Sequence, residues 1–87
     1  MNGIIVVTKA KYVKGYTLEL TFSDGIKANI DYSQWIEKYP FFEPLKDLNY
    51  FKKFSLDSWT VVWPNGADIA PETLHGIAAN TQQPQAI

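Results

Sequence analysis

Apolar and polar residues alternate along the first third of the chain. Every second residue is apolar from 16 to 22 and again from 26 to 30, with threonine, glutamate, lysine and asparagine between them. A period of two is typical of strands with one buried face. With the apolar run that begins at Ile4, the pattern predicts three strands between Ile4 and Ile30, joined as an antiparallel meander.

Loop lengths in this meander are constrained by the need to keep apolar residues on one face. A three-residue Ser23-Asp24-Gly25 loop pairs Phe22 with Ile26, whereas a two-residue loop would set Phe22 opposite Lys27. Glycine then stands at the position that requires a positive φ. The same rule upstream predicts a loop over residues 13–15, which pairs Ala10 with Leu18 and sets Lys9 opposite Glu19 on the outer face.

The middle of the chain predicts two short helices and a pair of short strands. Asp31 followed by Gln34 resembles a capping box for a helix through Trp35 and Ile36, which Pro40 ends. "FFEPL" is interpreted as an irregular apolar loop over the sheet. Asp47 can cap a second helix, Leu48 to Lys53, in which Leu48 and Phe51 share a face. "FSLDSWTVVW" is typical of two strands around Asp57-Ser58.

The segment "WPNGADIAPE", Trp63 to Glu72, combines turn residues with a helix start. A Pro64-Asn65-Gly66 loop would pair Trp63 with Ala67. Pro71 suits the first position of a helix with an apolar stripe at Leu74, Ile77 and Ala78, ending near Asn80. We expect Asp68 to bond the free amides at this helix start, because Ala70 has no side chain able to do so. Backbone geometry thus explains most residues of the segment. It leaves open whether Trp63, Asn65 and Glu72 face a partner or only the protein itself.

These elements together predict an α+β fold. It comprises a small antiparallel sheet, made of a three-stranded meander plus a C-terminal β-hairpin, and two or three short helices. With 87 residues we expect one domain over 1–80 and a flexible C-terminal tail over 81–87.

The composition excludes several kinds of chemical site and one class of partner. The chain has no cysteine and one histidine, His75, so a disulfide framework, a thiolate nucleophile and a Cys or His metal cluster are excluded. Its eight basic residues are all lysines and face nine acids. Because arginine supplies most bidentate contacts to phosphates and guanine, we expect no nucleic-acid partner. Lysines 9, 11 and 14 are interpreted as a solvated strand face.

The N-terminus carries no pattern of a targeting segment, and no stretch approaches the roughly 20 apolar residues of a membrane span. We therefore expect a soluble, cytoplasmic protein without a membrane partner.

Three stretches, "FSDG" (22–25), "PLKD" (44–47) and above all "TVVWPNGADIAPETL" (60–74), resemble an uncharacterised bacterial family, domain of unknown function 2442. The resemblance covers nearly the whole chain. It implies a small α+β domain without an established enzyme activity. Some relatives carry an added C-terminal helix-turn-helix, and others are encoded beside a second small protein in a suspected toxin–antitoxin arrangement. Only seven residues follow Asn80, so we do not expect the DNA-binding activity here.

No catalytic constellation emerges from the sequence. His75 lies beside the apolar stripe of its helix, and Asp68 with Glu72 is explained by the helix dipole. We predict no catalytic residue and no cofactor or metal. The favoured hypothesis is a non-catalytic protein-interaction module whose partner is another small protein. The alternatives are a homo-oligomeric structural or ligand-binding domain, with a homodimer formed through edge strands or the aromatic segment, and, behind these, a DNA-associated regulator.

Aromatic residues are the basis of the interaction hypothesis, because tryptophan and tyrosine are enriched at interface centres. An exposed aromatic patch on the monomer is expected, and burial of every ring would count against it. The candidate partner-binding residues are Trp63, Asn65, Asp68, Glu72, Trp35, Tyr39, Phe41 and Phe42.

Overall fold

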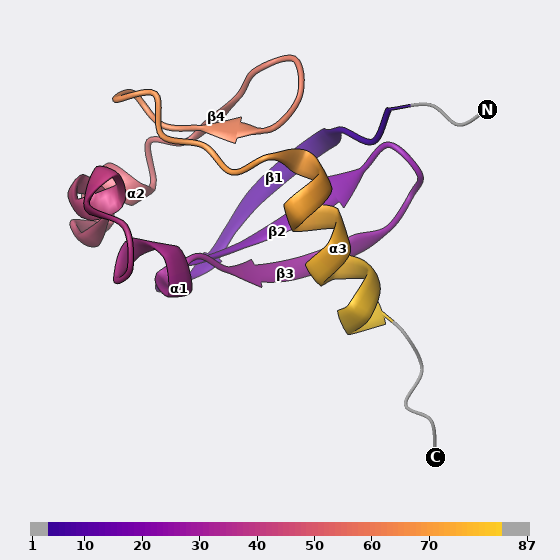
Figure 1. Cartoon of the computed structure of the whole chain (residues 1–87), viewed down its shortest axis with the longest axis horizontal. Coiled ribbons are helices and arrows are strands. Elements are labelled where there is room, and N and C mark those ends of the chain that lie inside the picture. The colour runs from indigo at the N-terminus through magenta and orange to yellow at the C-terminus, as the bar shows by residue number, and fades with distance from the viewer. Residues whose placement is uncertain (1–3, 83–87) are drawn as a thin grey trace.

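The computed structural model describes residues 4–82. A three-stranded antiparallel sheet, ordered β1-β2-β3, is followed by three short helical segments, a two-stranded sheet and a C-terminal helix (Figure 1). The elements are β1 (Val7–Lys14), β2 (Thr17–Phe22), β3 (Lys27–Asp31), α1 (Ser33–Ile36), η1 (Pro40–Lys46), α2 (Leu48–Phe51), β4 (Ser55–Leu56), β5 (Val61–Val62) and α3 (Pro71–Gln82). The predicted α+β architecture is confirmed.

The register between β2 and β3 is the one that the alternation predicts. Leu18 pairs with Ile30 and Leu20 with Ala28, and all four side chains are buried. The Phe22 N–H donates to the Ile26 carbonyl at 2.8 Å, which closes the expected three-residue loop.

The register between β1 and β2 differs from the prediction by two residues. Ala10 pairs with Leu20 rather than Leu18, and Glu19 lies opposite Lys11 rather than Lys9. Lys14 pairs with Thr17, so the loop holds two residues and begins with a glycine at φ 47°. A glycine at the first position is typical of a type II′ turn, whose twist suits a two-residue hairpin. Irregularities near both ends of β1 keep the apolar faces aligned despite the shorter loop.

Asp47 caps α2 as expected, whereas the predicted capping box of α1 is wrong: the N-cap of α1 is Tyr32, which makes no side-chain cap bond, and Asp31 lies one residue before it. The Asp31 carboxylate accepts from the Ser33 N–H at 2.9 Å, and Gln34 Nε2 donates to the Asp31 carbonyl at 3.0 Å. Asp47 likewise accepts from the Asn49 N–H at 2.9 Å. These short-range bonds fix the backbone where α1 and α2 begin.

Two expectations for the middle segment are wrong. "FFEPL" belongs to a 3-10 helix, η1, rather than to an irregular loop. Leu48 and Phe51 do not share a buried face, since Phe51 is fully buried and Leu48 is 41% exposed. A helix of one turn offers the core a single position, and Phe51 occupies it against Tyr12 and Tyr16.

The centre of the core is a group of aromatic rings from distant segments. Tyr32 contacts Phe51 at 5.9 Å and Trp63 at 5.2 Å between ring centroids, and Phe51 and Trp63 are 5.5 Å apart. All three rings are buried. Edge-to-face and tilted pairs at these distances add to the stabilisation from burial itself.

The turn around Pro64-Asn65-Gly66, with residues 61–69 on both sides of it, is called the C-terminal hairpin here and follows the predicted register. The Trp63 N–H donates to the Ala67 carbonyl at 3.0 Å, and Val62 bridges Asp68. α3 then packs against β3 and places Leu74 and Ala78 in the core. It begins at Pro71 as predicted but continues to Gln82, beyond the expected end at Asn80. The predicted tail at 81–87 therefore starts inside this helix, and residues 83–87 lie outside the described residues.

The expected cap of α3 by Asp68 is wrong. Asp68 is exposed, and no hydrogen bond joins its carboxylate to the start of the helix within residues 4–82. The Thr73 and Leu74 amides donate to the Ala70 carbonyl at 3.0 and 3.2 Å. The backbone of Ala70 therefore supplies the first acceptor of the helix, and a side-chain cap is not required for those two amides.

Candidate interaction surface

Trp63 lies in the core and not on a surface. Its side chain is 2% exposed, and Nε1 donates to the Phe51 carbonyl at 2.7 Å. A tryptophan is buried without penalty where its N–H finds an acceptor, and this one does. Trp63 therefore fixes the C-terminal hairpin onto α2, so its role is structural.

Asn65 joins the hairpin loop to the aromatic segment that precedes it by more than twenty residues. Its Nδ2 donates to the Phe41 carbonyl at 3.2 Å, and its Oδ1 accepts from the Ala67 N–H at 3.0 Å. One amide side chain thus shapes its own turn and holds η1 beside that turn. The bond to Phe41 needs a donor and the bond within the turn needs an acceptor, and the asparagine amide has both.

Two of the candidate aromatic residues are exposed and adjacent to a buried third. Tyr39 is 49% exposed and Phe41 57%, whereas Phe42, which contacts both rings, is 6% exposed. The Phe42 centroid lies 6.4 Å from that of Tyr39 and 6.4 Å from that of Phe41. Phe42 therefore anchors the segment and presents its neighbours to solvent. We refer to Tyr39 and Phe41 together as the aromatic surface.

Of the remaining candidates, Trp35 reaches the aromatic surface through its backbone alone, because its carbonyl accepts from the Tyr39 N–H at 2.9 Å. Trp35 is half-buried and packs edge-on against Tyr32 at 5.3 Å. Asp68 and Glu72 are exposed, and no ring contact or hydrogen bond connects them to Tyr39 or Phe41 in the described part of the chain. The structure thus links Asn65, Phe41, Phe42 and Tyr39 into one unit. It does not bring Trp63, Asp68 or Glu72 into it.

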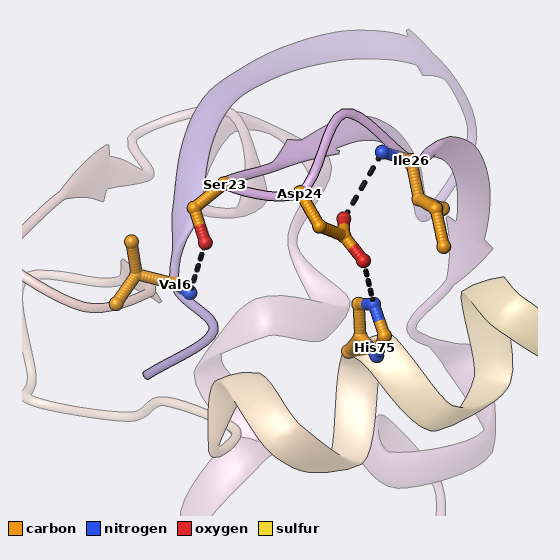
Figure 2. A network of polar contacts seen from close by, with 5 residues as sticks. All are labelled: Val6, Ser23, Asp24, Ile26 and His75. Carbon is orange, nitrogen blue, oxygen red and sulfur yellow. Dashed lines mark hydrogen bonds and ion pairs between the residues drawn. The ribbon is translucent and has the colours of Figure 1, made fainter. Parts of the chain in front are cut away.

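A polar cluster that sequence reasoning missed connects α3 to the β2–β3 loop (Figure 2). His75 Nε2 lies 2.7 Å from Asp24 Oδ2, and Asp24 Oδ1 accepts from the Ile26 N–H at 3.1 Å. The hydrogen bond with His75 is the largest cause that lowers the pKa of Asp24 below its ordinary value. Nearby, Ser23 Oγ accepts from the Val6 N–H at 3.1 Å. No local pattern signals a pair so far apart in sequence.

Trp59 is a third exposed ring, 51% exposed, on the turn between β4 and β5. Asp57 Oδ1 accepts from the Trp59 and Thr60 amides at 2.7 and 2.8 Å. These bonds, first the one from Thr60, lower the pKa of Asp57. The Trp59 carbonyl accepts from the Val7 N–H at 2.9 Å and so holds this turn beside β1.

The surface of residues 4–82 has no pocket, and these residues hold no group of three or more metal-ligating side chains. None of the described helices has the length and apolar character needed to cross a membrane.

A family model described as "Protein of unknown function (DUF2442)" matches residues 7–79. The chain belongs to this family. The match runs from the first residue of β1 into α3, so it includes the aromatic surface, η1 and the C-terminal hairpin. A comparison with curated proteins found no match, and neither did one with solved structures.

Proposed function

We propose that this domain is a non-catalytic protein-interaction module that binds its partner through Tyr39 and Phe41. The observation that carries the proposal is their exposure, 49% and 57%, next to the buried ring of Phe42. Large aromatic side chains are enriched among the residues that dominate binding energy. Their exposure in a chain that buries Trp63, Phe51 and Tyr32 so completely supports a role outside the core.

The backbone under the aromatic surface is held in place before any partner binds. Phe42 packs into the core, the Asn65 amide bonds the Phe41 carbonyl, and the Phe42 N–H donates to the Tyr39 carbonyl at 2.9 Å. A segment held in this way loses little conformational entropy on association, which favours affinity. The surface of the described residues, 4–82, has no pocket and so suits a protein partner better than a small molecule, because small ligands bind in concave sites.

The partner class that we propose is another small protein. The support for this step is the family relationship, in which some members are suspected to pair with a small companion in a toxin–antitoxin arrangement. The proposal for this chain is narrower in one respect: the companion would cover Tyr39 and Phe41.

The test is a pull-down from the native host with the wild-type domain, Tyr39→Ala, Phe41→Ala and Trp59→Ala. Trp59 is a matched control because it is equally exposed but lies on the β4–β5 turn. We expect one specific protein to be lost with Tyr39→Ala and Phe41→Ala and retained with Trp59→Ala. Circular dichroism should show that all four proteins fold. Trp63→Ala is unsuitable because it removes a core ring.

The captured protein is then purified and titrated calorimetrically against each variant. Removing a central aromatic side chain should weaken binding about tenfold or more. Equal affinities of Phe41→Ala and Trp59→Ala for that protein would rule out the aromatic surface as its binding site.

A further inference from the structure

Asn65 directly precedes Gly66 in the loop of the C-terminal hairpin, and this dipeptide has a reactivity of its own. The backbone nitrogen of the residue that follows an asparagine can attack the side-chain amide. A glycine leaves that nitrogen unshielded because it has no Cβ. Gly66 is exposed, so the dipeptide is accessible to the water that the reaction consumes.

The reaction is a deamidation in two steps. The Gly66 nitrogen loses its proton to solvent and bonds to Asn65 Cγ, the Cγ–Nδ2 bond breaks, and Nδ2 takes a proton from solvent and leaves as ammonia. Water then opens the resulting succinimide ring at either carbonyl carbon. Opening at Cγ gives aspartate, and opening at the main-chain carbonyl gives isoaspartate, whose backbone runs through the former side chain. The sum consumes water and releases ammonia, without an oxidant or a reductant.

Both reacting groups are held by hydrogen bonds in the folded hairpin. The Gly66 N–H donates to the Trp63 carbonyl at 2.8 Å, and Asn65 Nδ2 donates to the Phe41 carbonyl at 3.2 Å. Asn65 Oδ1 also accepts from the Ala67 N–H at 3.0 Å. The reaction therefore requires that the bonds of the Gly66 nitrogen and of Asn65 Nδ2 break.

Opening the loop disturbs the core beside it. Trp63 is 2% exposed, its backbone N–H donates to the Ala67 carbonyl at 3.0 Å, and its Nε1 donates to the Phe51 carbonyl at 2.7 Å. The residue that closes the loop is thus also a residue of the core. Local openings become rarer as they break more buried contacts, so the reactive form of the loop is rare in the folded chain.

We propose that Asn65 is a spontaneous deamidation site which the folded hairpin protects, and whose product detaches η1 from the hairpin. Aspartate at position 65 keeps an oxygen for the Ala67 N–H but has no N–H to donate, so its carboxylate meets the Phe41 carbonyl as a second acceptor. Isoaspartate in addition adds a methylene to the backbone of the turn, which changes the spacing between Trp63 and Gly66.

The detached segment carries Phe41, one of the two rings of the aromatic surface. Its backbone is then no longer held in place before binding, so deamidation weakens the binding of a partner. This last consequence rests on the proposed function. The reaction and the release of η1 do not, because both are measured without a partner.

The reaction is tested by peptide mapping with mass spectrometry on the full chain, incubated in mildly alkaline buffer with and without urea. In urea, Asn65 should react about as fast as Asn2, which also precedes a glycine, and faster than Asn49, which precedes a tyrosine. In buffer alone, Asn65 should react at least about tenfold more slowly than in urea.

Two tryptophan variants connect the rate to the hairpin. Trp63→Phe removes the donor to the Phe51 carbonyl, so the loop should open more often and Asn65 should react severalfold faster in buffer. Trp59→Phe changes an exposed ring on the β4–β5 turn and should leave the rate unchanged. If Trp63→Phe fails to fold, the comparison between buffer and urea still decides the question.

Amide hydrogen exchange measures the release of η1. The Phe42 N–H donates to the Tyr39 carbonyl at 2.9 Å, so its exchange reports the order of this segment. Asn65→Asp reproduces one product and should speed exchange at Phe42 about fivefold or more. Asn80→Asp adds the same charge at an exposed position of α3 and should leave this exchange unchanged.

Equal rates at Asn65 in buffer and in urea overturn the proposal, because the fold would then give no protection. A folded Trp63→Phe chain that deamidates at the wild-type rate overturns it as well, since the hairpin would not control the reaction. Unchanged exchange at Phe42 in Asn65→Asp overturns the release of η1. None of these outcomes bears on the aromatic surface, which has its own partner test.

Discussion

His75 Nε2 lies 2.7 Å from Asp24 Oδ2, across 51 positions of sequence. The pair joins the first turns of α3 to the loop between β2 and β3, and the His75 ring also packs edge-on against Phe22 at 5.2 Å. One side chain therefore contacts the loop through Asp24 (Figure 2) and the strand before it through Phe22. Leu74 and Ala78 attach α3 to the core through apolar contacts, and the His75–Asp24 pair adds a charge dependence to this attachment.

Asp24→Asn is predicted to make stability less dependent on pH. Hydrogen bonds from His75 and Ile26 lower the pKa of Asp24 below 3.8 in the folded chain. The unfolded chain therefore binds the proton more readily, so the stabilisation is present above the unfolded pKa and is lost as pH falls through the folded pKa. The free energy of unfolding of Asp24→Asn should lie below wild type near pH 7 and approach it below about pH 4.

Urea unfolding at both pH values measures this difference. Asp68→Asn removes an exposed carboxylate elsewhere and serves as the control. A gap between Asp24→Asn and wild type that stays constant with pH would contradict the assignment.

Tyr32→Phe is predicted to leave stability unchanged or to raise it by up to about 1 kcal/mol. The Tyr32 hydroxyl is buried and has no hydrogen-bond partner in the described chain, and burial raises the pKa of this phenol above its usual range. Removing an unsatisfied buried group relieves its desolvation cost. The matched variant is Tyr16→Phe, whose hydroxyl donates to the Lys46 carbonyl and whose loss should cost about 1 kcal/mol. Chemical denaturation that ranks Tyr32→Phe below Tyr16→Phe would refute this reasoning.

The β2–β3 hairpin could be predicted from the sequence, because two constraints agree there. The alternation determines which face of the strands is buried, and Gly25 is the residue of this loop that has a positive φ. The β1–β2 register could not, because Gly15 fits either the third position of a three-residue loop or the first position of a two-residue loop. Local pattern does not distinguish these loops, and the strand irregularities that accommodate the shorter one depend on tertiary packing.

The candidate site was predictable only in part, for a related reason. The excess of aromatic residues indicated that some rings would be exposed, but burial depends on which segments meet in space. Trp63 is buried because the Phe51 carbonyl is there to accept its N–H, and Phe41 is exposed because Phe42 takes the inward position. The bond from Asn65 to Phe41 spans two separate elements, so neither motif alone contains it.

Trp63→Phe is predicted to destabilise the fold by about 2 kcal/mol or more. The substitution removes the donor to the buried Phe51 carbonyl and leaves space beside Tyr32. Trp59→Phe, at an exposed ring, should change stability by no more than about 0.5 kcal/mol. Thermal unfolding followed by circular dichroism compares the two without relying on tryptophan emission. Equal melting temperatures would show that the indole N–H contributes nothing to stability.

Gly76→Ala and Gly66→Ala are predicted to act in opposite directions. Gly76 is an exposed residue of α3 without a positive φ, and an added Cβ would meet nothing within 4 Å. Alanine should therefore stabilise the chain by about 0.5–1 kcal/mol through its helix propensity. Gly66 also has space around it but adopts φ 87°, so alanine there should cost about 1 kcal/mol or more through backbone strain alone. Urea unfolding of both variants measures the contrast, and a stabilised Gly66→Ala would show that the hairpin turn tolerates another backbone conformation.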